Sequence, residues 1–238
     1  IYEEREGTVM KNQFKGKQYD YRIIIEAIGL YYHFSLSYRD CAKIMRKFSV
    51  GVDHTTIYRW NKEYGKILYH LWNKRRSLSK SWRIDETYVK VKGQDRYLYR
   101  AIDSKGNTLD MWLRNHRDTV STKAFFKRLI RVYGQPRSIV TDKYAPSLKA
   151  IKELKEEGIL YQKVKHWKSK YLNNILEQDH RQLKGKLPYG NNFQSTYTAA
   201  VTIKGIEVVS ALYKESRREI GLFDFSPWEE IDTLFKSA

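Results

Sequence analysis

The sequence has 238 residues, 41% of them hydrophobic and 14% aromatic, which is enough for one large domain or two small ones with a sizeable core. Its 45 Lys and Arg residues outnumber 27 Asp and Glu residues, and the net charge of +18 is too large for an ordinary enzyme of small neutral substrates. Such an excess favours binding to a polyanion. We find no apolar run of membrane-spanning length and no signal-peptide pattern, so we expect a cytoplasmic protein with no membrane partner. The single cysteine, Cys41, excludes an internal disulfide and a zinc site built on paired cysteines.

The first part of the chain indicates helices. Residues 1–19 are polar without a clear period, and we expect an N-terminal arm. The apolar stretch DYRIIIEAIGLYYHF then begins with Asp20, a suitable N-cap. Ser37 and Asp40 resemble a capping box that starts a second helix, which SVGVD is expected to end at Gly51.

A third helix is expected to start after Asp53, with Ile57, Trp60 and Tyr64 facing inward. Helix, short turn and helix in this order predict a helix-turn-helix DNA-binding domain over residues 20–69. A plain three-helix bundle is the alternative, because helical hairpins are common. In the DNA-binding interpretation, the outward side chains that could contact base edges are His54, Thr55, Thr56 and Arg59.

Residues 70–80 form a basic connector, which we expect to link two domains. A run of charge is usually only solvated, but a basic linker between two DNA-facing domains would also track phosphates. Its candidate contacts are Lys74, Arg75 and Arg76.

The hydrophobic period then changes and predicts a mixed α/β domain over residues 81–215, followed by a C-terminal tail over 216–238. An antiparallel meander should be joined to parallel crossovers in one sheet. The expected strands are 81–93, 96–103, 108–115, 136–142 and 159–167, and the expected helices are 119–134, 145–158, 171–187 and 195–220.

Three carboxylates occupy positions that are inconvenient for a purely structural role. Asp85 interrupts a strand expected to be central, where an unpaired buried carboxylate costs several kcal/mol. Asp142 ends another strand, where α/β sheets usually place ligands, although it could instead cap the next helix. Glu177 lies on the helix expected at 171–187, where a solvated face with a Glu177–Arg181 pair is the alternative. Separated acids of this kind suit Mg²⁺ or Mn²⁺, and two such ions can drive phosphodiester transfer.

The motifs WRIDETYVKVKG, IVTDKYAP and SKYLNNILEQDHRQLK resemble those of the DDE transposases of bacterial insertion sequences, in particular insertion-sequence family six. The resemblance runs from about Phe14 to about Pro227. It implies a ribonuclease-H-like catalytic domain in which Asp85, Asp142 and Glu177 are the catalytic acids and metal ligands. It also implies that Lys184 binds phosphate near the scissile bond. Further DNA contacts expected on the same helix are Asn173, Asn174, His180 and Arg181.

The resemblance further implies binding to terminal inverted repeats, metal-dependent cleavage and strand transfer of double-stranded DNA, and a homodimer or larger synaptic assembly. A bacterial protein associated with the nucleoid or a plasmid is expected. Two alternatives stay open: a regulator on a catalytically inactive transposase scaffold, and a structure-specific nuclease. Glu86 should point to the strand face opposite Asp85, and Asp103 and Asp110 should be turn and surface residues.

Overall fold

The computed structural model describes residues 13–74, 78–169, 185, 193–219 and 226–236. Its contacts divide the chain into two compact units, which we describe separately. The first comprises residues 1–76, 183–190 and 197–238, and the second comprises residues 77–182 and 191–196. Within the described residues, no helix is long and apolar enough to cross a membrane.

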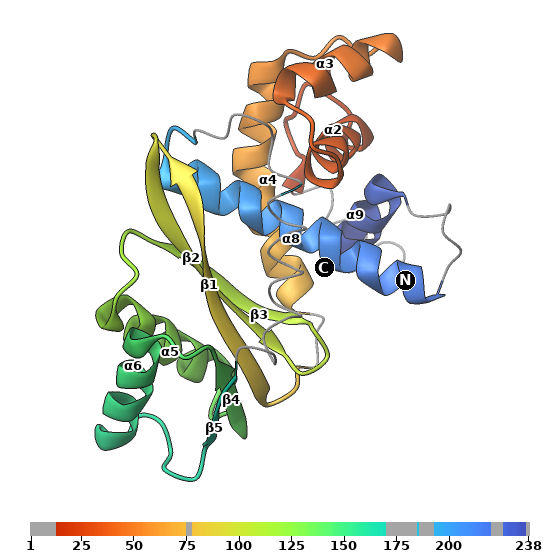
Figure 1. The fold of residues 1–238 in the computed structure, drawn as a ribbon. Coiled ribbons are helices and arrows are strands. Elements are labelled where there is room, and N and C mark those ends of the chain that lie inside the picture. The colour runs from red at the N-terminus through yellow and green to blue at the C-terminus, as the bar shows by residue number, and fades with distance from the viewer. Residues whose placement is uncertain (1–12, 75–77, 170–184, 186–192, 220–225, 237–238) are drawn as a thin grey trace. The chain divides into compact units, whose positions relative to one another are not determined.

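The described part of the first unit is helical (Figure 1). The predicted caps are confirmed: the Asp20 side chain accepts the Arg22 N–H, and Ser37 and Asp40 form a complete capping box. Asp53 accepts the Thr55 N–H at 2.8 Å, at the start of the third of these helices. The helices are α2 (Tyr21–His33), α3 (Tyr38–Lys47), α4 (His54–Lys74), α8 (Thr196–Glu219) and α9 (Pro227–Lys236).

The turn between α3 and α4 begins before the expected break at Gly51. Helix α3 ends at Lys47, and the N–H groups of Phe48 and Val50 both donate to the Met45 carbonyl at 3.0 Å. Ser49 takes the left-handed conformation with φ of 62°, so a serine, not the glycine, makes the reversal. Because Cβ strains this conformation in L-residues, the turn stores a cost of about 1–2 kcal/mol.

A buried tyrosine joins α2 to α4 and α8. The Tyr32 side chain is fully buried, and a Cβ added at Gly205 would lie 2.1 Å from its ring. A Cβ at Gly65 would lie 2.6 Å from its hydroxyl oxygen. The Tyr32 hydroxyl donates to the side-chain oxygen of buried Asn61, whose amide donates to Thr202 at 2.9 Å. Helix α8 therefore packs with the amino-terminal helices, although the sequence analysis assigned it to the sheet domain.

Two other expected boundaries also differ from the observed elements. Helix α4 continues to Lys74, five residues into the expected linker, because Leu71 and Trp72 are buried. The expected C-terminal tail contains helix α9, whose Ile231 and Phe235 are fully buried. A Cβ at Gly29 of α2 would lie 3.3 Å from Pro227, so α9 packs closely on α2.

The second unit contains a five-stranded sheet in the order β3-β2-β1-β4-β5. Strands β1, β2 and β3 form antiparallel pairs, whereas β1–β4 and β4–β5 are parallel. The predicted meander with parallel crossovers is confirmed, and β1 is central as expected. The elements are β1 (Ser81–Val91), β2 (Gln94–Asp103), β3 (Thr108–Arg114), α5 (Thr119–Tyr133), β4 (Ser138–Thr141), α6 (Ala145–Glu156) and β5 (Lys165–Lys168).

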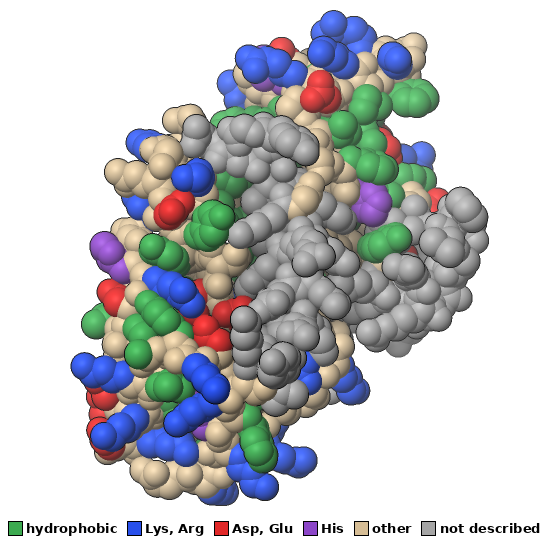
Figure 2. Space-filling view, viewed as in Figure 1, with side chains coloured by type: hydrophobic (Ala, Val, Ile, Leu, Met, Phe, Trp, Pro, Cys, Tyr) green, Lys and Arg blue, Asp and Glu red, His purple; other side chains and the backbone are tan. Residues whose placement is uncertain are grey.

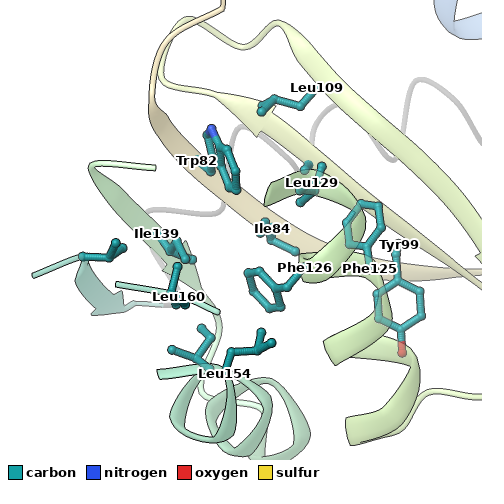
Figure 3. Packing of buried hydrophobic residues seen from close by; sticks show 13 residues of the cluster. Trp82, Ile84, Tyr99, Leu109, Phe125, Phe126, Leu129, Ile139, Leu154 and Leu160 are labelled. Atoms are coloured by element: carbon teal, nitrogen blue, oxygen red, sulfur yellow. The ribbon is translucent and has the colours of Figure 1, made fainter. Parts of the chain in front are cut away.

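One hydrophobic core fixes β1 against the helices that cover it. Figure 3 shows Trp82 and Ile84 of β1 facing Phe126 of α5, with Ile139 of β4 and Leu154 of α6 beside them. All five side chains are at most 2% exposed. Because alternate residues of a strand point to opposite faces, this core sets the direction of every β1 side chain.

Strand β5 starts at Lys165, later than the predicted residue 159. The N–H groups of Ile159 and Leu160 return to the Leu154 carbonyl and make a turn. Leu160 and Val164 are buried in the core cluster, so the apolar residues that suggested a strand anchor this turn instead.

The expectation that Asp103 and Asp110 lie on the surface was wrong. Asp103 is fully buried and accepts the N–H groups of Ser79 and Lys105, at 3.0 and 2.8 Å. Asp110 is 4% exposed and pairs with Arg128 of α5. Backbone donors and a guanidinium compensate the burial of these two carboxylates.

Candidate active site

The strand register brings Asp85 and Asp142 to the same level of the sheet. The parallel pairing of β1 with β4 matches Arg83 with Val140. Asp85 lies two residues beyond Arg83, and Asp142 lies two residues beyond Val140, immediately after the carboxyl end of β4. Two of the three predicted metal ligands thus come from neighbouring strands, at the edge where α/β sheets place ligands.

Asp85 lies on the face of β1 that is turned away from the core. Trp82 and Ile84 point into the core, so the side chain of the next residue points to the other face. Asp85 is partly exposed, and its Oδ1 accepts the N–H of Glu86 at 2.9 Å. The strand around this partly exposed residue is therefore fixed by packing.

Asp142 is held by the segment that leads into α6. Its Oδ1 accepts the Tyr144 N–H at 3.0 Å, and its Oδ2 lies 3.7 Å from Nη2 of Arg117. Helix α6 has Tyr144 at its N-cap position, with no side-chain cap hydrogen bond. The alternative role of Asp142 as a helix cap is therefore not what the structure shows, and a third of its side chain stays exposed.

Glu86 places a third acid beside this pair, on the core side of β1. Its side chain is 2% exposed, with Arg117 Nη2 3.3 Å from Oε2 and the Ser147 hydroxyl 3.3 Å from Oε1. Burial raises the pKa of Glu86 to about 7; Arg117 opposes the rise, while Asp85 and Asp142 add to it. Figure 2 shows acidic side chains gathered over the region of β1 and α5, bordered by Lys and Arg.

Arg117 was not among the predicted site residues. Arg117 lies between β3 and α5, and its partner Glu86 is 31 residues away in the chain, so no local pattern links them. The only sequence signal was the dipeptide Asp85–Glu86, in which the second acid was expected on the opposite face, as the structure confirms.

The donor chemistry of Asp85 and Asp142 fits a hard divalent cation, because both are carboxylates and neither is fully buried. In the part of the chain that the structure describes, no group of three or more His, Cys, Asp or Glu could hold a metal ion. Glu177, the third predicted ligand, lies outside that part. The predicted site residues outside the described part are Arg75, Arg76, Asn173, Asn174, Glu177, His180, Arg181 and Lys184.

The predicted DNA-reading residues gather on one exposed side of the first turns of α4. Ile57, Trp60 and Tyr64 are buried, as the helical period predicted. Four side chains were predicted to read bases, and all of them are at least partly exposed: His54, Thr55, Thr56 and Arg59. Lys74 was predicted to contact DNA from the linker. It is instead the last residue of α4.

Comparison with known proteins identifies the family. A family model described as a DDE domain matches residues 79–216, more than half of the chain. The transposase for the insertion sequence-like element IS431mec of Staphylococcus aureus is 46% identical over 227 residues, covering 95% of this chain and 100% of that protein. The chain belongs to the DDE transposases of insertion sequences. The Staphylococcus aureus transposase for the element IS257 in transposon Tn4003 matches with the same identity and coverage.

These matches confirm the resemblance drawn from the motifs, to the transposases of insertion-sequence family six. Among solved structures, the catalytic core domain of the HTLV-2 integrase in complex with magnesium shares 16% identity, with a TM-score of 0.38. That match covers 68% of this chain and 86% of the integrase chain. The ribonuclease-H-like sheet of this transposase is seen in its own strand order and pairing.

Proposed function

We propose that this transposase binds the terminal inverted repeats of its insertion sequence and catalyses metal-dependent cleavage and strand transfer of DNA. The observation that carries the proposal is that Asp85 and Asp142 each lie two residues beyond the paired residues Arg83 and Val140 of neighbouring strands, in a chain of the DDE family. The Staphylococcus aureus transposases, which this chain matches over their whole length, support the same proposal.

In this proposal Asp85, Asp142 and Glu177 hold two divalent ions, Mg²⁺ or Mn²⁺. When bound, such ions supply an activated oxygen nucleophile and stabilise the leaving oxygen. The pairing of β1 with β4 supports this assignment, because it would hold the two aspartates near each other before substrate arrives. Lys184 and Arg181 bind substrate phosphates, and Asn173, Asn174 and His180 orient the substrate or the acid.

The proposed reaction has two displacement steps. In the first, water attacks the phosphorus at the element end, the bond to the 3′ oxygen breaks, and a 3′-hydroxyl is freed. In the second, that hydroxyl attacks a target phosphodiester, forming one P–O bond and breaking another. Neither step needs a covalent enzyme intermediate or ATP.

Recognition of the element ends is assigned to α4. In helix-turn-helix proteins the first residues of the second helix contact base edges, and here Arg59 and Thr55 are exposed in that place. Farther along the same helix, the Lys62 and Lys66 ammonium groups lie 5.7 and 4.3 Å from the centroid of the Tyr197 ring. One aromatic ring therefore gathers two positive charges, which suits contact with phosphates.

We further propose that two or more copies act together, because transfer joins two element ends to one target. An end-to-end DNA bridging assay tests this. Complexes that always contain one copy and one end would contradict it.

The proposed chemistry is tested by strand transfer. Asp85→Asn keeps the size of the side chain but removes its charge, so we expect loss of joined product with end binding retained. Purified protein is mixed with a labelled inverted-repeat duplex bearing a free 3′-hydroxyl and a supercoiled target, in Mg²⁺ and in EDTA.

Asp95→Asn is the matched control, because Asp95 lies at the exposed end of β2 near Lys90 and should leave joining unchanged. Joined product from Asp85→Asn at the wild-type level would contradict the assignment of Asp85. Tight end binding by the wild type without joining in any metal would support a catalytically inactive regulator instead.

A further inference from the structure

We propose that Arg117 is a positioning residue that fixes the carboxylate of Asp142, and that Glu86 and Tyr144 hold Arg117 in place. The inference rests on the proposed role of Asp142 as a metal ligand. Arg117 itself is assigned no contact with the reacting atoms.

A single guanidinium nitrogen lies between two carboxylates. Nη2 of Arg117 is 3.3 Å from Oε2 of Glu86 and 3.7 Å from Oδ2 of Asp142. Glu86 belongs to the central strand β1, and Asp142 follows β4. The arginine comes from the segment between β3 and α5, so it links three parts of the second unit at one point.

Tyr144 contacts both Arg117 and Asp142. Its ring centroid is 3.8 Å from the Arg117 guanidinium carbon, and its hydroxyl donates to the Arg117 carbonyl at 3.0 Å. Its backbone N–H donates to Oδ1 of Asp142. The two oxygens of Asp142 are therefore approached by different groups that also contact each other, and such a closed set restricts rotation of the carboxylate.

Glu86 anchors the arginine from the buried side. A carboxylate with 2% of its side chain exposed needs a charge partner and hydrogen-bond donors, and Arg117 and Ser147 supply them. Removing the guanidinium would leave this acid buried beside two others. One nitrogen approaches both acids, but a lysine ammonium cannot also lay a planar group on the Tyr144 ring, so lysine is a poor replacement.

A role limited to charge balance would give different results from positioning. Removing a positive charge beside metal ligands would by itself strengthen cation binding, and a lysine would replace the arginine without loss. Positioning predicts that cation binding weakens even in variants that keep the charge, because these variants disturb the geometry of the carboxylate.

The test uses Arg117→Lys and Tyr144→Phe, which both keep the net charge, in the full-length protein. Mn²⁺ binding is measured without DNA by electron paramagnetic resonance, and strand transfer is measured against Mg²⁺ concentration. We expect Arg117→Lys to weaken Mn²⁺ binding by about 10–100-fold, as for other groups that orient metal ligands. Tyr144→Phe should shift binding in the same direction by a smaller factor, and inverted-repeat binding in EDTA should stay at the wild-type level.

Arg114→Lys is the matched control, because Arg114 lies three residues earlier and stacks on Trp112 instead, 4.4 Å from its ring centroid. It should bind Mn²⁺ as the wild type does. If Arg117→Lys does not fold by circular dichroism, Tyr144→Phe carries the test alone. The proposal would be overturned if the charge-conserving variants that fold bound Mn²⁺ with wild-type affinity. It would also be overturned if Asp142→Asn did not weaken Mn²⁺ binding. Because Mn²⁺ binding is read without catalysis, a wild type that binds Mn²⁺ but never joins DNA would refute only the proposed function.

Discussion

At Asp85 one step along a strand separates the hydrophobic core from the opposite face of the sheet. Ile84 is buried against α5, Asp85 is turned to the opposite face, and Glu86 returns to the core side, where it meets Arg117. Neighbouring side chains of a strand point to opposite faces, so these three consecutive residues serve as a core residue, a proposed metal ligand and a partner of Arg117.

His166 gives a second residue-scale consequence, which concerns pH. Its Nε2 lies 2.9 Å from the Thr141 hydroxyl, and burial, followed by the charges of Lys168 and Lys155, lowers the pKa of His166 to about 4. In the unfolded chain the pKa returns to about 6.5. The unfolded state therefore binds more protons between these values, and we predict that the free energy of unfolding falls as pH drops from 6.5 to 4.

The measurement is urea unfolding at pH 7.5 and at pH 5, for the wild type and for His166→Asn. Asparagine cannot take up the proton, so the wild type should lose more stability than the variant over this interval. Because both proteins share every other titrating group, parallel losses would show that His166 does not contribute.

At the scale of elements, α8 is held by the fit of one ring against two glycines. Replacing Gly205 by alanine would gain intrinsic helix propensity, worth up to about 1 kcal/mol. The new Cβ would lie 2.1 Å from the Tyr32 ring, which is fully buried and bonded to Asn61. We therefore predict a net loss of about 1–3 kcal/mol in the free energy of unfolding, measured from urea curves.

Gly51→Ala is the control, because a Cβ there meets nothing within 4 Å and its φ is not positive. The change in stability should be within about 0.5 kcal/mol, as for other surface positions. Equal effects of the two substitutions would show that the Tyr32 contact does not limit the packing of α8.

Elements were predictable where short-range chemistry decides them. Asp20, Ser37 and Asp53 marked helix starts because a cap bonds to N–H groups two or three residues away. The partner of α8 was not predictable, since it depends on Tyr32, which is distant in the chain. The start of β5 was misplaced because the apolar residues Ile159 and Leu160 form a local turn onto Leu154, and an apolar pattern does not distinguish such a turn from a strand. For the site, the order of strands placed Asp85 and Asp142, whereas the Glu86–Arg117 contact had no local signal.

At the scale of the whole molecule, the charge of +18 predicts DNA binding that weakens steeply with salt. Each neutralised phosphate adds about −0.9 to the slope of log affinity against log salt concentration. Substitutions on α4 should separate two kinds of contact. Lys66→Ala should reduce the magnitude of that slope by about 1 for every DNA sequence, whereas Arg59→Ala should lose about 1–3 kcal/mol of discrimination for the inverted repeat.

Binding to an inverted-repeat duplex and to a scrambled duplex, each at several salt concentrations, checks both expectations. If Lys66→Ala changed the discrimination between the two duplexes, Lys66 would not be a simple phosphate contact. If Arg59→Ala left the ratio of the two affinities unchanged, Arg59 would not read a base.

The alternation of β1 has a consequence for how this transposase can change over generations. One residue inserted between Trp82 and Asp85 would carry the acid into the core and turn an isoleucine outward, because a strand repeats every two residues. The segment should therefore accept substitutions but no change of length. The hairpin at residues 92–93, by contrast, is an exposed turn whose length could vary. Copies of the element that decay in a genome should thus lose transposition through single-codon insertions in β1 sooner than through those in the hairpin.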